Sequence, residues 1–324
     1  MKQQMWKPLQ PGDIVDIAAP GMPTSRSTLF KAKAFLKSWG LVGRYPREIL
    51  GKDLLCSNSK AVREKLLKTA LVAKDSRGVW CIRGGYGSFE LLNALKEIKK
   101  IPPAKAFLGL SDITSLHHFL QQQWGWSTLH SSNMDRYALE NAPQKESKIL
   151  KSVLFGRTQQ VEFTLKPLNA KARKKQSFRG LMSGGNLITC QATIGTPFEM
   201  QNQGKILFFE DIGERGYKVD RILKHFAMAG LLKGVRGVVF GEFVGGREHK
   251  GPSKVPKVMQ AFADTQKFPV FSGLPCGHGK FQMPLPFGAP AKLSGGAKGI
   301  LTVSSGVDIK AVKAQSSVIS TGLL

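Results

Sequence analysis

Strand-like runs alternate with helix-like patterns along the first part of this 324-residue chain. Runs at 12–19, 78–82 and 106–109 are each followed by a segment with apolar residues at helical spacing. Strands that alternate with helices favour a parallel sheet flanked by helices. In such sheets, binding clefts form at the carboxyl ends of the strands. The pattern therefore predicts an α/β fold and directs attention to the residues that follow each strand.

The length of the chain and a change of pattern along it predict two domains. Residues 1–150 are expected to form a Rossmann-like α/β domain with a parallel sheet. Residues 151–177 are polar and basic without a sustained helical face, and we expect them to be a linker. Residues 178–324 are expected to form a smaller, mixed-β C-terminal domain, with strand-like runs at 205–212 and 235–243.

The formal net charge of +26 implies attraction for anions such as nucleic acid, anionic lipid, acidic cell-wall material or an acidic substrate. The basic residues show no stripe interleaved with aromatics, so dedicated nucleic-acid binding is not expected. No apolar run is long enough for membrane insertion, and the N-terminus lacks the apolar core of a secretory signal. We expect a cytoplasmic protein, or a periplasmic one if a signal preceded residue 1.

The cysteines are far apart in sequence and show neither a C-x-x-C pair nor a metal-like Cys/His spacing; they are Cys56, Cys81, Cys190 and Cys276. Free thiols in a reducing compartment are expected, with no metal and no other cofactor. Cys276 lies two residues before a histidine but lacks the turn context of a nucleophile.

Ser111 follows an apolar run that ends at Gly109, and a helical pattern begins directly after it. This pattern is typical of a strand, a tight turn and a helix with a serine at the apex. The hydroxyl then lies at the carboxyl edge of the sheet, beside the N–H groups that open the next helix. Nucleophilic hydrolases need that arrangement.

A serine hydroxyl becomes nucleophilic when a neighbouring histidine, oriented by a carboxylate, takes its proton. His278 lies between two glycines, where the backbone can bend to present the ring, and His130 ends a predicted strand where it can line the cleft. Glu210 is the first acid after the apolar run 206–209, which favours it as a rigidly held carboxylate. Asp211, Glu214 and Asp220 lie close by, and an acidic cluster at a helix N-terminus is the alternative interpretation.

Four motifs in order along the chain together resemble the LD-carboxypeptidase family, the serine peptidases that include the microcin-immunity hydrolases. They are G-L-S-D-I-T (109–114), G-G-N-L-(x)7-G-T-P (184–197), E-D-I-x-E-x-x-Y-x-V-D-R (210–221) and G-x-P-x-G-H (273–278). Each motif alone is weak, but their order and spacing are specific, and the resemblance spans nearly the whole chain.

The resemblance implies a triad of Ser111 as nucleophile, His278 as general base and Glu210 as orienting carboxylate. It implies a metal-independent, dimeric enzyme that removes the terminal D-alanine of the murein tetrapeptide at the bond from meso-diaminopimelate. An acyl-enzyme would form on the serine. Backbone N–H groups of Asp112 and of Gly84 or Gly85 are the candidate oxyanion hole.

Substrate recognition is less defined by the sequence. Arg83 is a candidate clamp for the terminal carboxylate of the substrate, and His130 is a candidate lining residue. The family usually has an aromatic where this chain has Leu110, and often Gly-Pro where it has Ser131 and Ser132; we expect these positions to line the cleft. The alternatives are hydrolysis of a peptide–nucleotide amide, or a non-catalytic protein that binds cell-wall fragments or nucleic acid.

Overall fold

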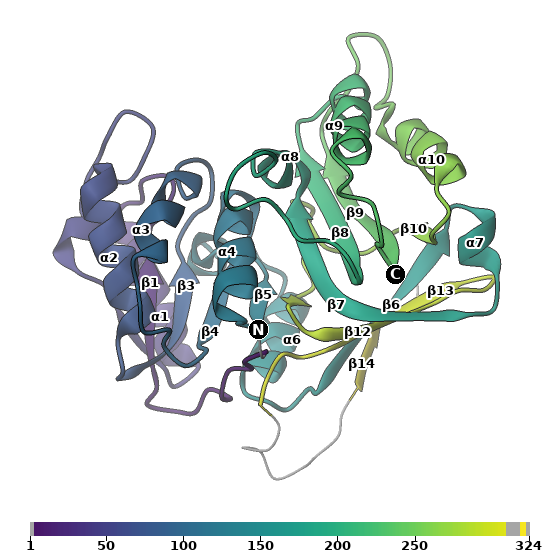
Figure 1. Cartoon of the computed structure of the whole chain (residues 1–324). Helices are drawn as coiled ribbons and strands as arrows, with labels where there is room; N and C mark the ends of the chain where they lie inside the picture. Colours follow the sequence, from purple (N-terminus) through teal and green to yellow (C-terminus); the bar gives the residue numbers. More distant parts are fainter. Residues whose placement is uncertain (1–2, 309–317, 322–324) are drawn as a thin grey trace.

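The computed structural model describes residues 3–308 and 318–321, so the parts of the expected domains at 1–2, 309–317 and 322–324 lie outside the described residues. Two sheets lie side by side, each with helices against it (Figure 1). Within the described ranges, every helix is too short or too polar to span a bilayer.

The first sheet has the strand order β11-β5-β4-β3-β1-β2. Neighbouring strands from β2 to β5 are parallel, as expected, whereas β11 runs antiparallel to β5. The strands are β1 (Ile14–Ala18), β2 (Val42–Arg44), β3 (Ser76–Cys81), β4 (Ala106–Gly109), β5 (Thr128–His130) and β11 (Leu285–Phe287). The helices of this part are α1 (Arg26–Ser38), α2 (Lys60–Val72), α3 (Leu92–Lys96), α4 (Thr114–Trp124), α5 (Met134–Ala138) and α6 (Gln144–Leu154), with 3₁₀ turns η1 (Arg47–Leu50), η2 (Phe89–Leu91) and η3 (Ser111–Ile113).

Helix α1 illustrates how the sequence fixes these elements. The Ser25 hydroxyl accepts the N–H of Thr28 and caps the first turn. The helix buries Leu29, Ala32 and Leu36, which share one face at helical spacing. The predicted alternation of strands and helices in the first part of the chain is confirmed.

The second sheet has the order β10-β9-β8-β7-β12-β13-β6-β14, and an additional pairing between β10 and β6 closes it into a barrel-like form. Strands β7 to β10 are parallel, and β12, β13 and β6 continue the sheet antiparallel. The strands are β6 (Gln160–Pro167), β7 (Ser177–Asn186), β8 (Lys205–Ile212), β9 (Gly237–Val244), β10 (Val270–Ser272), β12 (Pro290–Ser294), β13 (Gly299–Ser304) and β14 (Val318–Thr321). The helices are α7 (Ala170–Arg173), α8 (Leu187–Gln191), α9 (Gly216–Met228) and α10 (Val255–Thr265).

The expected linker at 151–177 is largely regular structure. It contains the end of α6, all of β6 and all of α7. Strand β6 buries Val161, Phe163 and Leu165 in alternation with more exposed polar residues, a period-two pattern that the basic composition of the segment obscured. The second sheet therefore begins inside the segment expected to join the domains.

Strand β11 belongs by sequence to the expected C-terminal domain but is part of the first sheet. It lies late in the chain, yet it pairs with β5 at the edge of the first sheet. One hydrophobic core spans both sheets and includes Leu108, Phe208 and Phe287. The shared core and the crossing strand fix the two sheets against each other.

Candidate active site

Ser111 lies at the sharp turn between β4 and α4, and the predicted strand, turn and helix are confirmed. Its φ of 67° is in the left-handed region, which costs a residue with a Cβ about 1–3 kcal/mol. A Cβ at Gly109 would lie 2.7 Å from the Ile113 side chain, so a glycine allows this close turn. The strained backbone presents a half-buried hydroxyl at the carboxyl edge of the first sheet.

The loop after β3 backs directly against this turn. A Cβ added at Gly84 would lie 2.9 Å from the Leu110 carbonyl oxygen and 3.1 Å from the Ser111 Cβ. The N–H groups of Gly84 and Gly85 have no hydrogen-bond partner among the described residues. Gly84 lies beside the serine, and a free backbone donor at such a position is what an oxyanion hole requires.

Asp112 follows the serine and is buried. Its carboxylate accepts the Ser88 N–H at 2.9 Å, and burial raises the pKa of this carboxyl group. The side chain thus ties the turn at Ser111 to the loop after β3. Because the side chain is engaged there, the backbone is the part of Asp112 that is available beside Ser111.

Glu210 and His278 form a direct pair. Glu210 lies near the end of β8 and is fully buried, and its Oε2 lies 2.7 Å from Nδ1 of His278. Burial disfavours the charged imidazole and is the largest single effect. The hydrogen bond to Glu210 and the negative charges of Glu210, Asp211 and Glu242 together outweigh it, so the pKa of His278 is raised above its usual 6.5. Because the carboxylate occupies Nδ1, the Nε2 atom of the ring is left for chemistry.

The chain path brings this pair toward the edge that carries Ser111. The loop of His278 runs from β10 in the second sheet to β11 in the first. Leu285 of β11 pairs with His130 of β5, and His130 pairs with Gly109 of β4, two residues before Ser111. The chain therefore enters β11 at the same edge at which β4 ends.

A second connection joins the two halves through α4, which lies between the two sheets (Figure 1). Thr114 begins α4, and its hydroxyl accepts the N–H of Asn186 at 3.1 Å. Asn186 ends β7 and is in register with Glu210 on β8. A short path of hydrogen-bonded neighbours thus links the serine turn to the carboxylate.

Arg83 lies at the rim of a cavity of about 430 Å³ that Thr24, Ser25 and Thr28 also line. Its guanidinium donates to the Pro23 carbonyl at 3.0 Å and lies 3.4 Å from Asp135. The side chain is 42% exposed, so part of it is open to a ligand.

His130 was expected to line the cleft, and the structure places it elsewhere. It is fully buried, with its ring 5.3 Å from that of Phe208 and 5.1 Å from that of Phe287. Burial, with a contribution from His117, holds the pKa of His130 well below its usual value. The ring belongs to the core shared by the sheets and contributes no surface to a cleft.

The other expected lining positions are also buried. Leu110 is 7% exposed, and Ser131 and Ser132 are almost fully enclosed, so none of them lines an open cleft. Cys276 is fully buried, its Sγ lies 3.1 Å from the Met283 carbonyl, and burial raises its thiol pKa well above the usual range. A thiol in that state is a poor nucleophile at neutral pH.

Two side chains that the sequence did not single out contact the loop of His278. Glu242 of β9 accepts the Gly279 N–H at 3.0 Å, and Arg136 of α5 donates to the Gly279 carbonyl at 3.1 Å. Glu242 comes after a buried apolar run in its strand, as Glu210 does, so the rule that favoured Glu210 would also have found it. Arg136 is 143 residues from its partner and carries no local signal.

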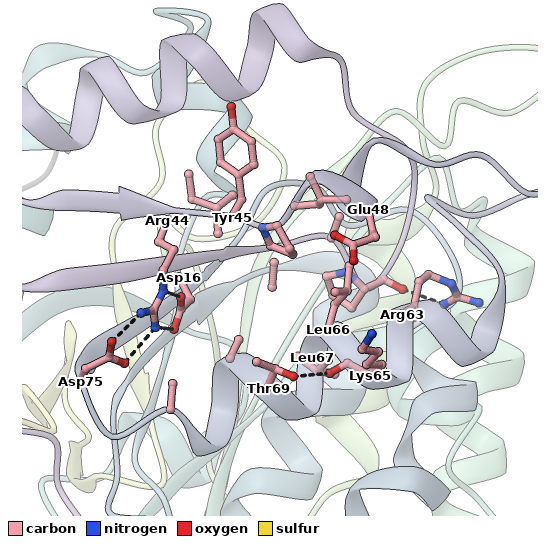
Figure 2. Close-up of a pocket in the computed structure, with 18 residues that line it drawn as sticks. Asp16, Arg44, Tyr45, Glu48, Arg63, Lys65, Leu66, Leu67, Thr69 and Asp75 are labelled. Atoms are coloured by element: carbon pink, nitrogen blue, oxygen red, sulfur yellow. Dashed lines mark hydrogen bonds and ion pairs between the residues drawn. The ribbon is translucent and has the colours of Figure 1, made fainter.

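Two cavities differ in what lines them. The cavity in Figure 2, about 510 Å³, lies between β1, β2 and α2, and Arg44 bridges Asp16 and Asp75 at its side, so these charges satisfy one another. The cavity of about 640 Å³ beside His278 is lined by Arg136, Asn141, Val244, His278, Gly279 and Lys280. The second carries a titratable ring with a free nitrogen and is the better place for chemistry. Among the described residues, no cluster of three or more His, Cys, Asp or Glu side chains is arranged to hold a metal ion.

Comparison with known families matches both parts of the chain. The LD-carboxypeptidase N-terminal domain matches residues 15–131, and the LD-carboxypeptidase C-terminal domain matches residues 179–293. A putative carboxypeptidase of Rickettsia conorii is 36% identical over 75% of this chain and 76% of its own. A probable murein peptide carboxypeptidase of Bacillus subtilis is 30% identical over 95% and 96%, and the murein tetrapeptide carboxypeptidase of Pseudomonas aeruginosa is 25% identical over 90% and 96%. The chain belongs to the LD-carboxypeptidase family of serine-type hydrolases.

Solved structures show the same fold. The muramoyltetrapeptide carboxypeptidase of Oxalobacter formigenes aligns over 90% of this chain and 98% of its own, with a TM-score of 0.74 and 23% identity. The microcin C7 self-immunity protein aligns over 94% and 99%, with a TM-score of 0.79 and 18% identity.

Proposed function

We propose that this protein removes the terminal D-alanine from murein tetrapeptides by cutting the bond from meso-diaminopimelate, with Ser111, His278 and Glu210 as its triad. The observation that carries the proposal is the 2.7 Å contact between Glu210 and His278, whose loop leads into β11 at the edge of the first sheet where β4 ends just before the strained Ser111. The names of the murein-acting relatives support the substrate class.

Acylation would begin when Ser111 Oγ attacks the carbonyl carbon of the scissile bond. His278 Nε2 accepts the hydroxyl proton, while Glu210 holds Nδ1 and stabilises the imidazolium. The developing oxyanion would accept hydrogen bonds from the N–H groups of Asp112 and of Gly84 or Gly85. Loss of one such donor costs about 3 kcal/mol in other hydrolases. His278 then gives its proton to the amine of D-alanine, which departs and leaves the acyl group on Ser111.

Deacylation reverses the roles. Water attacks the ester carbonyl, His278 Nε2 takes its proton, and the proton then passes to Ser111 Oγ as the ester bond breaks. The products are D-alanine and the shortened peptide with a new carboxyl group. Arg83 is proposed to bind the carboxylate of the D-alanine residue, since its guanidinium is partly exposed beside the hydroxyls of Thr24, Ser25 and Thr28.

Hydrolysis of a peptide–nucleotide amide is the second candidate. The likeness to the microcin immunity protein favours it, and Tyr86, 61% exposed beside Gly85, offers a ring on which a base can stack. Three expectations stay predictions: that the protein forms a homodimer, that it is cytoplasmic, and that it does not bind nucleic acid as a dedicated function.

Release of D-alanine tests the proposal. The wild type and Ser111→Ala are incubated with L-Ala-γ-D-Glu-meso-DAP-D-Ala, with the pentapeptide and with a peptidyl-adenylate amide, and the products are followed by mass spectrometry. The proposal expects tripeptide and D-alanine from the tetrapeptide with the wild type only. Turnover of the adenylate alone favours the second candidate. Tight binding of the tetrapeptide without turnover by either protein indicates a non-catalytic binding protein.

A further inference from the structure

The loop that presents His278 is tied down on both sides of the ring. The Gly277 N–H donates to Gln282 Oε1 at 2.6 Å, and the Gly279 N–H donates to Glu242 Oε2 at 3.0 Å. Hydrogen bonds to the residues directly before and after His278 limit rotation of the loop. These bonds therefore restrain the backbone on both sides of His278.

Arg136 holds the same loop from the opposite sheet. It lies in α5, which follows β5 of the first sheet, and donates to the carbonyls of Gly279 at 3.1 Å and Lys280 at 2.6 Å. These bonds cross between the two halves of the site. A guanidinium suits this task because its planar fork can donate to several acceptors at once.

Glu146 of α6 is the centre of this network. It is fully buried. Its Oε1 accepts from Ser132 Oγ (2.9 Å), Tyr137 Oη (3.0 Å) and Arg136 Nε (3.2 Å), and its Oε2 accepts from Arg136 Nη2 (3.0 Å) and the Gln282 N–H (2.9 Å). The carboxylate therefore orients Arg136 and also fixes the residue whose side chain holds Gly277.

Ser132 belongs to this network and is also a position at which the chain departs from the family pattern. It is one of the two residues that replace the Gly-Pro often found in the family after the histidine of β5. Its hydroxyl points to Glu146 and not to a cleft. The departure from the family pattern thus adds a donor to the buried carboxylate.

We propose that Glu146 and Arg136 are positioning residues for His278. Glu146 holds the guanidinium of Arg136, Arg136 holds the carbonyls of Gly279 and Lys280, and the loop holds the ring so that Nδ1 meets Glu210. The inference rests on the proposed function, because it assigns these residues a part in aligning the base of that mechanism. A displacement of about 1 Å in such a group can cost on the order of 100-fold in rate.

The competing explanation is that the network only stabilises the fold, and the chain offers a matched control for it. Arg44 also forms paired hydrogen bonds with a buried carboxylate, that of Asp16, and with Asp75 (Figure 2). It lies at the far edge of the first sheet, on β2, and makes no contact with the loop of His278. Arg44→Lys therefore removes a guanidinium fork of the same kind without touching the site.

The kinetic test compares Arg136→Lys, Glu146→Gln and Arg44→Lys on the murein tetrapeptide, with Tm measured for each. We expect kcat to fall about tenfold or more in the first two variants, with KM within about twofold of the wild type, and Arg44→Lys to keep both constants. Arg136→Lys keeps the charge and carries the test if Glu146→Gln does not fold. A rise in KM with unchanged kcat would show that Arg136 binds substrate, and equal losses in Arg44→Lys would show a structural role; either result overturns the inference.

A second readout needs no substrate, so it separates this inference from the proposed function. The His278 ring is titrated by NMR in the full chain, and its resonance is assigned with His278→Gln. Loosening of the loop is expected to weaken the bond to Glu210 and to shift the His278 pKa downward in Arg136→Lys but not in Arg44→Lys. If the His278 titration is identical in all three proteins, the positioning role is excluded even where the peptide is hydrolysed.

Discussion

The two halves of the candidate site are held in different ways. Ser111 is positioned chiefly by backbone shape, through a left-handed turn that Gly109 and Gly84 make possible by leaving room. His278 is positioned by side chains, through Glu210 and the network of Glu146 and Arg136. The first half is held by a contact such as that of Ser88 with Asp112, 24 residues apart, and the second by partners up to 144 residues apart.

This difference predicts which substitutions each half tolerates. The serine half should respond to added bulk, because close backbone contacts leave no space for a Cβ. The histidine half should respond to lost charge or lost hydrogen bonds, because these fix the ring. Substitutions, pH and salt test that contrast.

Removal of the charge behind His278 should have the largest effect. Glu210→Gln keeps the shape but loses the charge that stabilises the imidazolium, and we expect kcat to fall about 10³–10⁴-fold. Asp211→Asn is the matched control, because Asp211 is also buried but bonds to Asn186 and the Ile188 N–H. Steady-state kinetics on the tetrapeptide measures both. Equal losses in the two variants would contradict the assigned role of Glu210.

Added bulk beside Ser111 should come next. In Gly84→Ala the new Cβ meets the Leu110 carbonyl at 2.9 Å, so the loop must move away from the serine, and we expect about a 100-fold fall in kcat. Gly78→Ala on β3 is the control, since its Cβ would make ordinary contacts from 3.4 Å outward. A Gly84→Ala enzyme with wild-type kcat would show that the loop after β3 takes no part in the reaction.

The pH dependence of kcat/KM should follow the ionisation of His278. Only neutral His278 can accept the serine proton, so activity is lost as the pH falls through its pKa. Burial lowers the pKa of His278 and Glu210 raises it, and the net shift is upward. The acidic limb of kcat/KM should therefore lie above pH 6.5. In the residual activity of Glu210→Gln the limb should move to lower pH. A limb that stays in place would mean that another group titrates.

Salt should have the smallest effect and should act on both halves alike. The net charge of +26 favours capture of an acidic muropeptide, and added salt screens that attraction over about 8 Å at physiological ionic strength. We expect kcat/KM to fall severalfold between low salt and about 0.5 M while kcat stays constant. A flat kcat/KM would show that the basic surface plays no part in substrate capture.

Local pattern was enough to predict much of the fold. The turn at Ser111 and the strands and helices that form the parallel part of the first sheet follow from neighbours within a few residues. The same reasoning misread β6, because it lies in a polar and basic segment that hid its alternating pattern, and gave no sign that β11 returns to the first sheet. The resemblance to the family, and not local pattern, brought Glu210 and His278 to attention as a pair.

The sequence by itself determined the strained serine, because strand, glycine and helix lie next to one another and their geometry is local. Only the tertiary structure decided which side chains hold the histidine, which removed His130 from the cleft and drew Arg136 and Glu146 to the loop of His278. The physical reason is that buried hydrogen bonds and shared cores join residues far apart in sequence. Their pairing depends on how the two sheets pack, and no spacing along the chain records it.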